Sequence, residues 1–157
     1  MRLHVCAVGR LRAGAPEHAL VFDYFDRAGR TGRALGLGPV NLHEVEDRKG
    51  GGMAAEGALL ARAVPDGAVL VVLDERGQDL DSPAFAARLA GWRDQGRGDV
   101  AFVIGGADGI DPGLRARADL AVRFGGMVWP HMLARVMLAE QIYRATTILA
   151  GTPYHRI

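Results

Sequence analysis

The sequence has few residues of the types that most often act as nucleophiles or metal ligands. Cys6 is the only cysteine, so an internal disulfide is excluded, and its place in an apolar segment predicts a buried, unreactive thiol. Ser82 is the only serine and no G-x-S-x-G motif is present, which argues against a serine hydrolase. The histidines are scattered without the spacing of metal ligands, so we expect no metal site.

Long apolar runs are missing as well. No run approaches the roughly 20 residues that a transmembrane helix needs. The N-terminal segment lacks the apolar stretch and the small-residue cleavage pattern of a signal peptide. With 49% hydrophobic and 24% charged residues, the composition is that of an ordinary globular protein. We therefore expect a cytoplasmic protein, without membrane contact, that forms one domain over residues 1–157.

Two glycine motifs that bind nucleotides are absent. The segment "GGADG" (105–109) does not have the G-x-G-x-x-G spacing of dinucleotide-binding folds, and no loop ends in the Gly-Lys-Ser/Thr of phosphate-binding loops. The sequence therefore does not support the common dehydrogenase and kinase classes.

Charge of one sign is not in large excess, since the formal net charge is +1. This balance argues against extended non-specific binding of nucleic acid. The C-terminal part of the chain is nevertheless basic, with Arg123, Arg135, Arg144 and Arg156 against one acid, Glu140. Such an end can hold a local phosphate, and pairing of arginine with glutamate on a helix surface is an equally open interpretation.

Short apolar runs alternate with amphipathic segments along the chain, with the lengths of strands and helices. Strands of this near-continuous apolar type are typical of a parallel sheet covered on both sides. We therefore predict an α/β fold with a mostly parallel sheet and helices on both faces. The expected strands are 3–9, 40–45, 68–74, 100–106 and 119–124, and the expected helices are 15–35, 53–64, 82–95, 112–118 and 131–149.

Two of these helices have distinct start signals. Asp81-Ser82-Pro83 and Asp111-Pro112 each place a capping side chain ahead of a proline suited to the first helical turn. We assign Ser82 to this capping role. Both helices begin shortly after a strand ends, which is where open α/β sheets bind ligands.

Three loops that follow strands carry glycine but no obvious catalytic acid or nucleophile: 73–78, 104–109 and 123–131. Glycine lets a ligand approach the backbone closely, so these loops are suited to hold a ligand through N–H and C=O groups. An adenosine-containing cofactor that brings its own reactivity fits such a site. Gly109 has the simpler alternative of serving the turn before Asp111.

The segment "MVWPHMLARVMLAEQIYRATTILAGTPYHRI" (127–157) is much more specific than any glycine motif. Together with "VVLDERG" (71–77) and "FVIGGADG" (102–109), it resembles the SPOUT-class RNA methyltransferases, and within them the ribosomal RNA large subunit methyltransferase H family. The resemblance covers nearly the whole chain. It implies an enzyme that uses S-adenosylmethionine to methylate ring nitrogen N3 of a pseudouridine in large-subunit (23S) ribosomal RNA.

The resemblance also implies a C-terminal trefoil knot, which is very rare among proteins, and a homodimer with its active site near the subunit boundary. The cofactor is expected to lie against the three glycine loops. The matching residues are Leu73, Gly105, Gly106, Gly125, Gly126, Met127, Val128, Trp129 and Pro130.

Methyl transfer to N3 requires removal of a weakly acidic proton or stabilisation of the anion. The basic tail is suited to the second task, with His155 and Arg156 as preferred groups and Arg144 as a third positive charge. Tyr154 is placed to stack on the base or to donate a hydrogen bond. For Arg144, an i,i+4 pair with Glu140 is an open alternative to substrate contact.

Other residues of the last helix also have structural alternatives. His131 is as well suited to cap the helix as to act in catalysis, and Arg135 is suited to pack its stem on a neighbouring helix. For Trp129 we favour packing over a lid. A core or a dimer interface explains the apolar side chains of the helix better than a ligand site, namely Leu133, Val136, Met137, Ile142 and Ile148.

Two other functions stay open from the residues alone. One is a SPOUT methyltransferase that acts on another RNA, and the second is a non-catalytic, ribosome-binding α/β module. Because the compact chain carries no appended RNA-binding domain, we expect it to act on assembled ribosomes rather than on bare rRNA.

Overall fold

The computed structural model describes residues 1–156 as five strands, five α-helices and one short 3-10 helix. The strands are β1 (Arg2–Val8), β2 (Val40–Val45), β3 (Val69–Asp79), β4 (Asp99–Ile104) and β5 (Leu120–Arg123). The helices are α1 (Pro16–Gly32), η1 (Arg33–Leu35), α2 (Gly52–Ala63), α3 (Ser82–Asp94), α4 (Pro112–Ala116) and α5 (His131–Ala150). No helix within residues 1–156 combines the length and the apolar character that a bilayer crossing requires.

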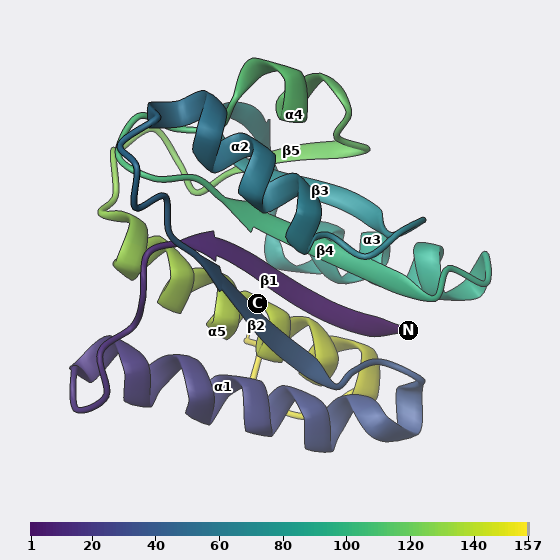
Figure 1. Cartoon of the computed structure of the whole chain (residues 1–157). Helices are drawn as coiled ribbons and strands as arrows, with labels where there is room; N and C mark the ends of the chain where they lie inside the picture. Colours follow the sequence, from purple (N-terminus) through teal and green to yellow (C-terminus); the bar gives the residue numbers. More distant parts are fainter. Residues whose placement is uncertain (157) are drawn as a thin grey trace.

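All five strands pair in parallel in the order β2-β1-β4-β3-β5. Parallel pairing places the carboxyl ends of all strands at one end of the sheet, together with the loops that follow them. In Figure 1 these loops gather at the left, and the N-terminus lies at the opposite end of β1. The predicted parallel α/β fold is therefore confirmed.

Helices cover both faces of the sheet, and alternate strand residues explain why. Leu3, Val5 and Ala7 of β1 join the core cluster that includes side chains of α1, α3 and α5. Cys6, between them, joins the second cluster, under α2 and α4. A strand buried on both sides has no polar face, which accounts for the continuous apolar runs in the sequence. Figure 1 shows α1 and α5 side by side on one side of the sheet, and α2 and α4 on the other.

Strand β3 is longer than the sequence predicts. It pairs with β5 through Leu73↔Val122, and the register then shifts so that Gln78 also pairs with Val122. Residues between these two points bulge out of the ladder at the carboxyl end of the sheet. The expected exit loop is therefore an irregular segment inside a strand that ends at Asp79.

The expected cap of α3 is corrected by one residue. Asp81, not Ser82, is the N-cap, and its carboxylate accepts a hydrogen bond from the Ala84 N–H at 2.7 Å. The Ser82 hydroxyl donates to the side chain of Gln141 instead, at 2.7 Å. Asp111 caps α4 as predicted, by accepting from the Leu114 N–H.

Candidate functional site

A small cavity lies where the glycine loops meet at the carboxyl end of β3, β4 and β5. Its volume is about 170 Å³. Among the predicted cofactor residues, its wall includes Leu73, Gly105, Gly106, Gly125, Met127, Val128 and Trp129. Gly126 and Pro130 lie in the same loop but are not part of the wall. Segments far apart in the sequence thus form one site, which we call the glycine cavity.

Contacts within the protein already explain why Gly105 and Gly106 are glycines, because a larger residue at either position would meet neighbouring atoms. A Cβ on Gly105 would lie 2.4 Å from the carbonyl oxygen of Gly109. A Cβ on Gly106 would lie 2.7 Å from a carboxylate oxygen of Glu56 in α2. Gly109 itself has φ of +89°, and its N–H bonds the Gly106 carbonyl, so it serves the turn.

The loop after β5 forms the other wall. The indole N–H of Trp129 donates to the Phe124 carbonyl at 2.8 Å and thereby closes the loop on itself. Met127 and Val128 at its tip are 76% and 87% exposed. Two neighbouring apolar side chains this exposed are typical of a surface that another molecule covers.

Asp74 is a cavity residue that the sequence analysis missed. Its carboxylate lies 3.3 Å from the guanidinium nitrogens of both Arg76 and Arg115 and accepts the Arg76 N–H at 2.8 Å. Burial acts to raise the pKa of Asp74, but the Arg76 hydrogen bonds and the Arg115 charge outweigh it, so the pKa lies below its usual value. The cavity therefore holds a permanent carboxylate. The available signal was an acid directly after an apolar strand.

His131 and Arg135 connect the start of α5 to this site. His131 lines the cavity, and no side chain caps the N-terminus of the helix. Arg135 is fully buried, and its guanidinium makes polar contacts beyond the packing of its stem that the sequence suggested. Its guanidinium lies 3.3 Å from a Glu44 carboxylate oxygen and donates to the carbonyls of Val8 and Gly9. It thus ties α5 to the ends of β1 and β2.

The predicted catalytic residues of the tail gather around one carboxylate, Glu140. Arg144 donates from Nε to Glu140 Oε1 at 3.0 Å, and the Tyr154 hydroxyl donates to the same oxygen at 3.0 Å. Gln141 donates to the other oxygen at 2.8 Å. The i,i+4 pair considered for Arg144 is therefore present and also organises the tail.

The geometry gives Tyr154 and His155 distinct roles in this tail cluster of Glu140, Arg144, Tyr154 and His155. Burial first, and then the hydrogen bond to Glu140, raise the pKa of Tyr154, so its hydroxyl stays protonated. The Arg144 guanidinium stacks on the Tyr154 ring, 4.9 Å from its centroid. Arg144 Nη1 lies 3.3 Å from His155 Nδ1; because a guanidinium only donates, Nδ1 accepts and the ring proton is on Nε2.

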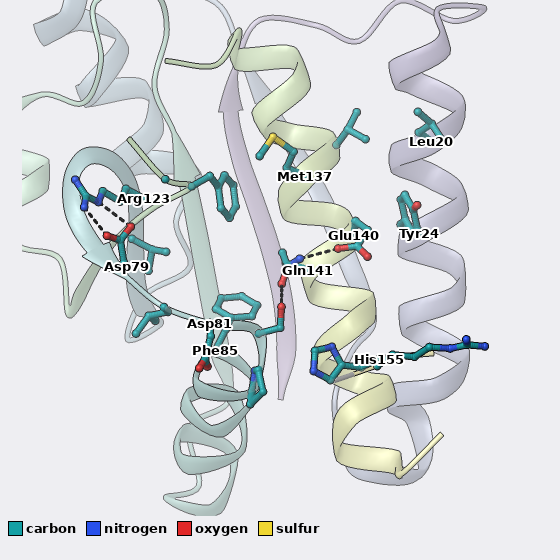
Figure 2. Close-up of a pocket in the computed structure, with 18 residues that line it drawn as sticks. Leu20, Tyr24, Asp79, Asp81, Phe85, Arg123, Met137, Glu140, Gln141 and His155 are labelled. Atoms are coloured by element: carbon teal, nitrogen blue, oxygen red, sulfur yellow. Dashed lines mark hydrogen bonds and ion pairs between the residues drawn. The ribbon is translucent and has the colours of Figure 1, made fainter. Parts of the chain in front are cut away.

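The tail does not face the glycine cavity of its own chain. His155 and Arg156 line a second cavity of about 920 Å³ between α1, α3 and α5. Figure 2 shows this cavity, with Glu140, Gln141 and His155 on one side and the Arg123–Asp79 ion pair on the other. Arg144 follows His131 by about 20 Å along the helix axis, at 1.5 Å per residue. The tail residues His155 and Arg156 and most of the predicted cofactor residues thus line different cavities of one chain, and Gly125 lies on the wall of both.

The other candidate residues of the sequence analysis have structural roles. Burial raises the pKa of the Cys6 thiol to about 12, as expected for an inert cysteine. Within residues 1–156, no three histidine, cysteine, aspartate or glutamate side chains are placed to hold a metal ion. Val136 and Ile142 are buried in the core, which is one of the two roles predicted for the apolar side chains of α5. Leu133 is exposed, so for this residue the interface role stays a prediction.

Comparison with known proteins gives one consistent result. Residues 1–155 match the family model described as "Predicted SPOUT methyltransferase". The chain is 76% identical to the ribosomal RNA large subunit methyltransferase H of Paracoccus denitrificans over 156 residues, which is 99% of both chains. The proteins of the same name from Roseobacter denitrificans and Ruegeria pomeroyi are 70% and 68% identical, over 99% and 100% of both chains.

A solved structure supports the same fold. The chain superimposes on a probable methylase family protein from Haemophilus influenzae with a TM-score of 0.52, over 99% of this chain and 70% of that one. At 11% sequence identity this likeness concerns the fold alone. Together with the family model and the close relatives, it assigns the chain to the SPOUT methyltransferases and, within them, to the ribosomal RNA large subunit methyltransferase H family.

Proposed function

We propose that this protein is an S-adenosylmethionine-dependent methyltransferase that methylates N3 of a pseudouridine in large-subunit ribosomal RNA. The observation that carries the proposal is the glycine cavity, whose wall includes seven of the nine residues expected to hold the cofactor. The relatives' names supply the RNA class, since they act on large-subunit ribosomal RNA. The proposal includes the knotted C-terminal segment and the cytoplasmic location that the family resemblance implies.

The chemistry of the cavity suits a cationic nucleoside. Backbone groups of the loops at Gly105, Gly125 and Met127 are suited to hold adenosine through hydrogen bonds. Glu75 on the same wall supplies a carboxylate for the sulfonium, whereas the Asp74 charge is already offset by Arg76 and Arg115. When bound, S-adenosylmethionine supplies the methyl group from its sulfonium. The protein's own contribution is to orient the donor and to keep water away from the methyl group.

The cavity of one chain is too small and too open to complete the site. Its volume of about 170 Å³ is below the roughly 300–1,000 Å³ of typical ligand pockets. Its outer wall, at Met127 and Val128, is exposed, and the tail cluster lies elsewhere. A homodimer resolves both features, because a second copy covers the exposed loop and brings its own His155 and Arg156 to the cofactor.

In that arrangement the tail acts on the target base. Arg156 supplies positive charge that favours the N3 anion over the protonated base. Arg144, whose charge is offset by Glu140, contributes by holding His155 in place. His155 presents an Nε2–H donor, because Nδ1 is held by Arg144. The phenol of Tyr154 is held by Glu140, and its ring contacts the Arg144 guanidinium and the Tyr143 ring. Stacking of the target base on Tyr154 therefore requires the Arg144 guanidinium to move off the ring.

Mass spectrometry of ribosomal RNA tests the proposed reaction. Purified protein is incubated with isotope-labelled S-adenosylmethionine and with assembled ribosomes from cells that lack the gene. We expect one labelled methyl group at N3 of a pseudouridine in large-subunit rRNA, and much less label on bare rRNA. Label on another RNA or another base contradicts the assignment of substrate. Absence of cofactor binding in calorimetry contradicts the assignment as an enzyme.

Mixed dimers test whether the site is shared. One copy carries Gly106→Leu, which places a large side chain on the wall of the glycine cavity and whose Cβ has the flexible carboxylate of Glu56 as its nearest neighbour. The other copy carries His155→Ala. Two different affinity tags allow the mixed dimer to be isolated. In a shared site one of two sites stays intact, so about half of the wild-type rate is expected, while each homodimer is inactive. An inactive mixed dimer contradicts the shared site.

A further inference from the structure

Three exposed cations stand out at the carboxyl end of the sheet. Arg12 lies in the loop after β1, and Arg48 and Lys49 lie in the loop after β2. Throughout residues 1–156, these three side chains make no ion pair. Most arginines elsewhere do, for example Arg2 with Asp99 and Arg27 with Asp23.

The acids that neighbour these cations in the sequence already have other partners. Glu46 pairs with Arg10 at 3.2 Å. The Asp47 carboxylate accepts hydrogen bonds from the backbone N–H groups of Lys49 and Gly51. Residues 9–15 carry two arginines and no acid, and residues 46–51 carry two cations and two acids, so the two loops together have a net charge of +2 although the chain as a whole is almost neutral.

The position of the loops relates them to the glycine cavity. They follow parallel neighbouring strands, so they emerge at the same end of the sheet as the cavity, at the left in Figure 1. The first loop also touches the start of α5: a Cβ on Gly9 would lie 3.3 Å from Met132 and 3.7 Å from the imidazole of His131. His131 in turn lines the cavity.

We propose that Arg12, Arg48 and Lys49 form a phosphate-docking surface for the substrate RNA, here called the basic rim. It holds backbone phosphates that flank the target nucleotide while the base enters the methyl-transfer site. Contacts of this type fix the position of RNA without reading its sequence, and they release counterions. The inference rests on the proposed RNA substrate and adds the surface by which that substrate is positioned.

A charge-matched pair of variants tests the basic rim. The first carries Arg12→Gln, Arg48→Gln and Lys49→Gln. The second carries Arg62→Gln, Arg97→Gln and Arg117→Gln. These three arginines are exposed and belong to none of the ion pairs within residues 1–156. They precede β3, β4 and β5, so they lie at the opposite end of the sheet. Both variants lose three positive charges, so a general change in net charge affects them equally.

Ribosome binding is measured by co-sedimentation, and KM and kcat are measured for the methylation reaction. Both measurements are repeated over a range of salt concentrations. For the basic-rim variant we expect ribosome binding about 10- to 100-fold weaker, a KM higher by the same factor, and kcat within about twofold of wild type. The slope of log affinity against log salt falls by about two to three, roughly one for each lost phosphate contact. The matched control keeps the wild-type values, and both variants bind S-adenosylmethionine normally.

Failure of this inference is distinct from failure of the proposed function. If the wild type methylates ribosomes and the basic-rim variant binds them as the control does, the basic rim is not the docking surface. If the wild type neither methylates nor binds any ribosomal RNA, the proposed function fails and the docking surface with it. A basic-rim variant that loses kcat while KM is unchanged also overturns the inference, because it assigns the cations to catalysis.

Discussion

The two ends of the sheet differ in how far their polar and apolar groups are exposed. At the carboxyl end, glycine loops leave backbone groups around a cavity, apolar side chains are exposed at Met127 and Val128, and cations stand without acids. At the amino end, a cluster of polar groups on β1, β2 and β4 is paired, although Arg62, Arg97 and Arg117 lie outside the ion pairs of residues 1–156. Asp99 accepts from Arg2 at 2.8 and 2.9 Å and from His4 at 2.8 Å, and His4 lies 3.0 Å from His43.

This difference teaches where function and stability reside in the fold. Unsatisfied or exposed groups at one end are available to ligands, whereas satisfied groups at the other end hold β1, β2 and β4 together. Variants at the carboxyl end should therefore change ligand binding, and variants at the amino end should change stability and its pH dependence. Single substitutions test this division, because each one should change either ligand binding or stability by an amount that can be measured.

Substitution of Arg135 is expected to have the largest effect. It should reduce both stability and cofactor binding, because this residue lies at the carboxyl end of the sheet and is also buried in the core. Arg135→Met removes a buried cation and leaves the carbonyls of Val8 and Gly9 without their donor. Loss of one partner of a buried pair costs about 3–5 kcal/mol. We expect about 3 kcal/mol in urea unfolding, since the Glu44 side chain is 24% exposed and regains water. Cofactor affinity should fall as well, because α5 loses its anchor.

A double variant separates the ion pair from the other contacts of Arg135. In Arg135→Met with Glu44→Gln, no uncompensated carboxylate remains, so part of the lost stability should return. The expected coupling is about 1 kcal/mol, within the range for directly contacting residues. Purely additive losses would show that Arg135 acts through the carbonyl contacts alone.

Gly105→Ala is expected to give the next largest effect. Its Cβ would lie 2.4 Å from the Gly109 carbonyl oxygen, so the turn that forms the cavity wall must shift. Overpacking of this kind costs about 1–3 kcal/mol, and calorimetry should detect no specific binding of S-adenosylmethionine.

Gly91→Ala is the matched control for the turn. Gly91 lies within α3, and a Cβ at this position would meet nothing within 4 Å. An alanine there should raise stability by about 0.5–1 kcal/mol, because glycine is unfavourable in a helix interior, and should leave cofactor binding unchanged. Normal binding by Gly105→Ala would mean that the cavity does not depend on this turn.

The sequence predicts those features of the fold that depend on residues close together in the chain. The strands could be predicted because successive residues such as Val71 and Val72 are buried on opposite faces of the sheet, which leaves a continuous apolar run. The α4 cap was predicted because Asp111 bonds three residues ahead. Both signals are local. The order of the strands and the burial of Arg135 depend on segments distant in the chain, which periodicity does not encode.

The candidate site divides in the same way. The loops around Gly105 and Gly125 were identified from glycine positions and from the family resemblance. In the network around Glu140, the i,i+4 pair with Arg144 was among the predicted alternatives. The contact of Ser82 with Gln141 was not predicted, because the two side chains meet only when α3 packs on α5. Asp74 was missed because a strand-end acid alone does not reveal the two arginines that keep it ionised.

At the amino end, Asp99→Asn tests the role of paired charge. The hydrogen bonds from Arg2 and His4 lower the pKa of Asp99 to about 2. Because the folded pKa is below the unfolded value of about 3.9, this carboxylate stabilises the fold fully above about pH 4 and loses that contribution as the pH falls toward 2. Asp99→Asn should cost about 1.5 kcal/mol at pH 7, in line with hydrogen bonds to charged groups.

Urea unfolding at pH 7, 4 and 2.5 measures this prediction. The wild type should lose its advantage over Asp99→Asn between pH 4 and 2.5, and cofactor binding at pH 7 should be the same in both. Asp94→Asn, which removes an exposed carboxylate beside Arg93, serves as the control and should change stability by less than about 0.5 kcal/mol. An Asp99→Asn variant that loses cofactor binding would contradict the separation of the two ends.

His43 gives the smallest expected effect and the finest test of the amino end. Burial, and then the neighbouring His4, lower the pKa of His43 below 6.5. The unfolded chain therefore takes up a proton at this position more readily than the folded one, so stability should decline as the pH falls below about 6.5. His43→Gln keeps a side-chain donor for His4 but does not titrate. At pH 7.5 it should stay within about 0.5 kcal/mol of wild type, and between pH 7.5 and 5 it should lose less stability than wild type does. Equal losses in the two proteins would place the acid sensitivity elsewhere.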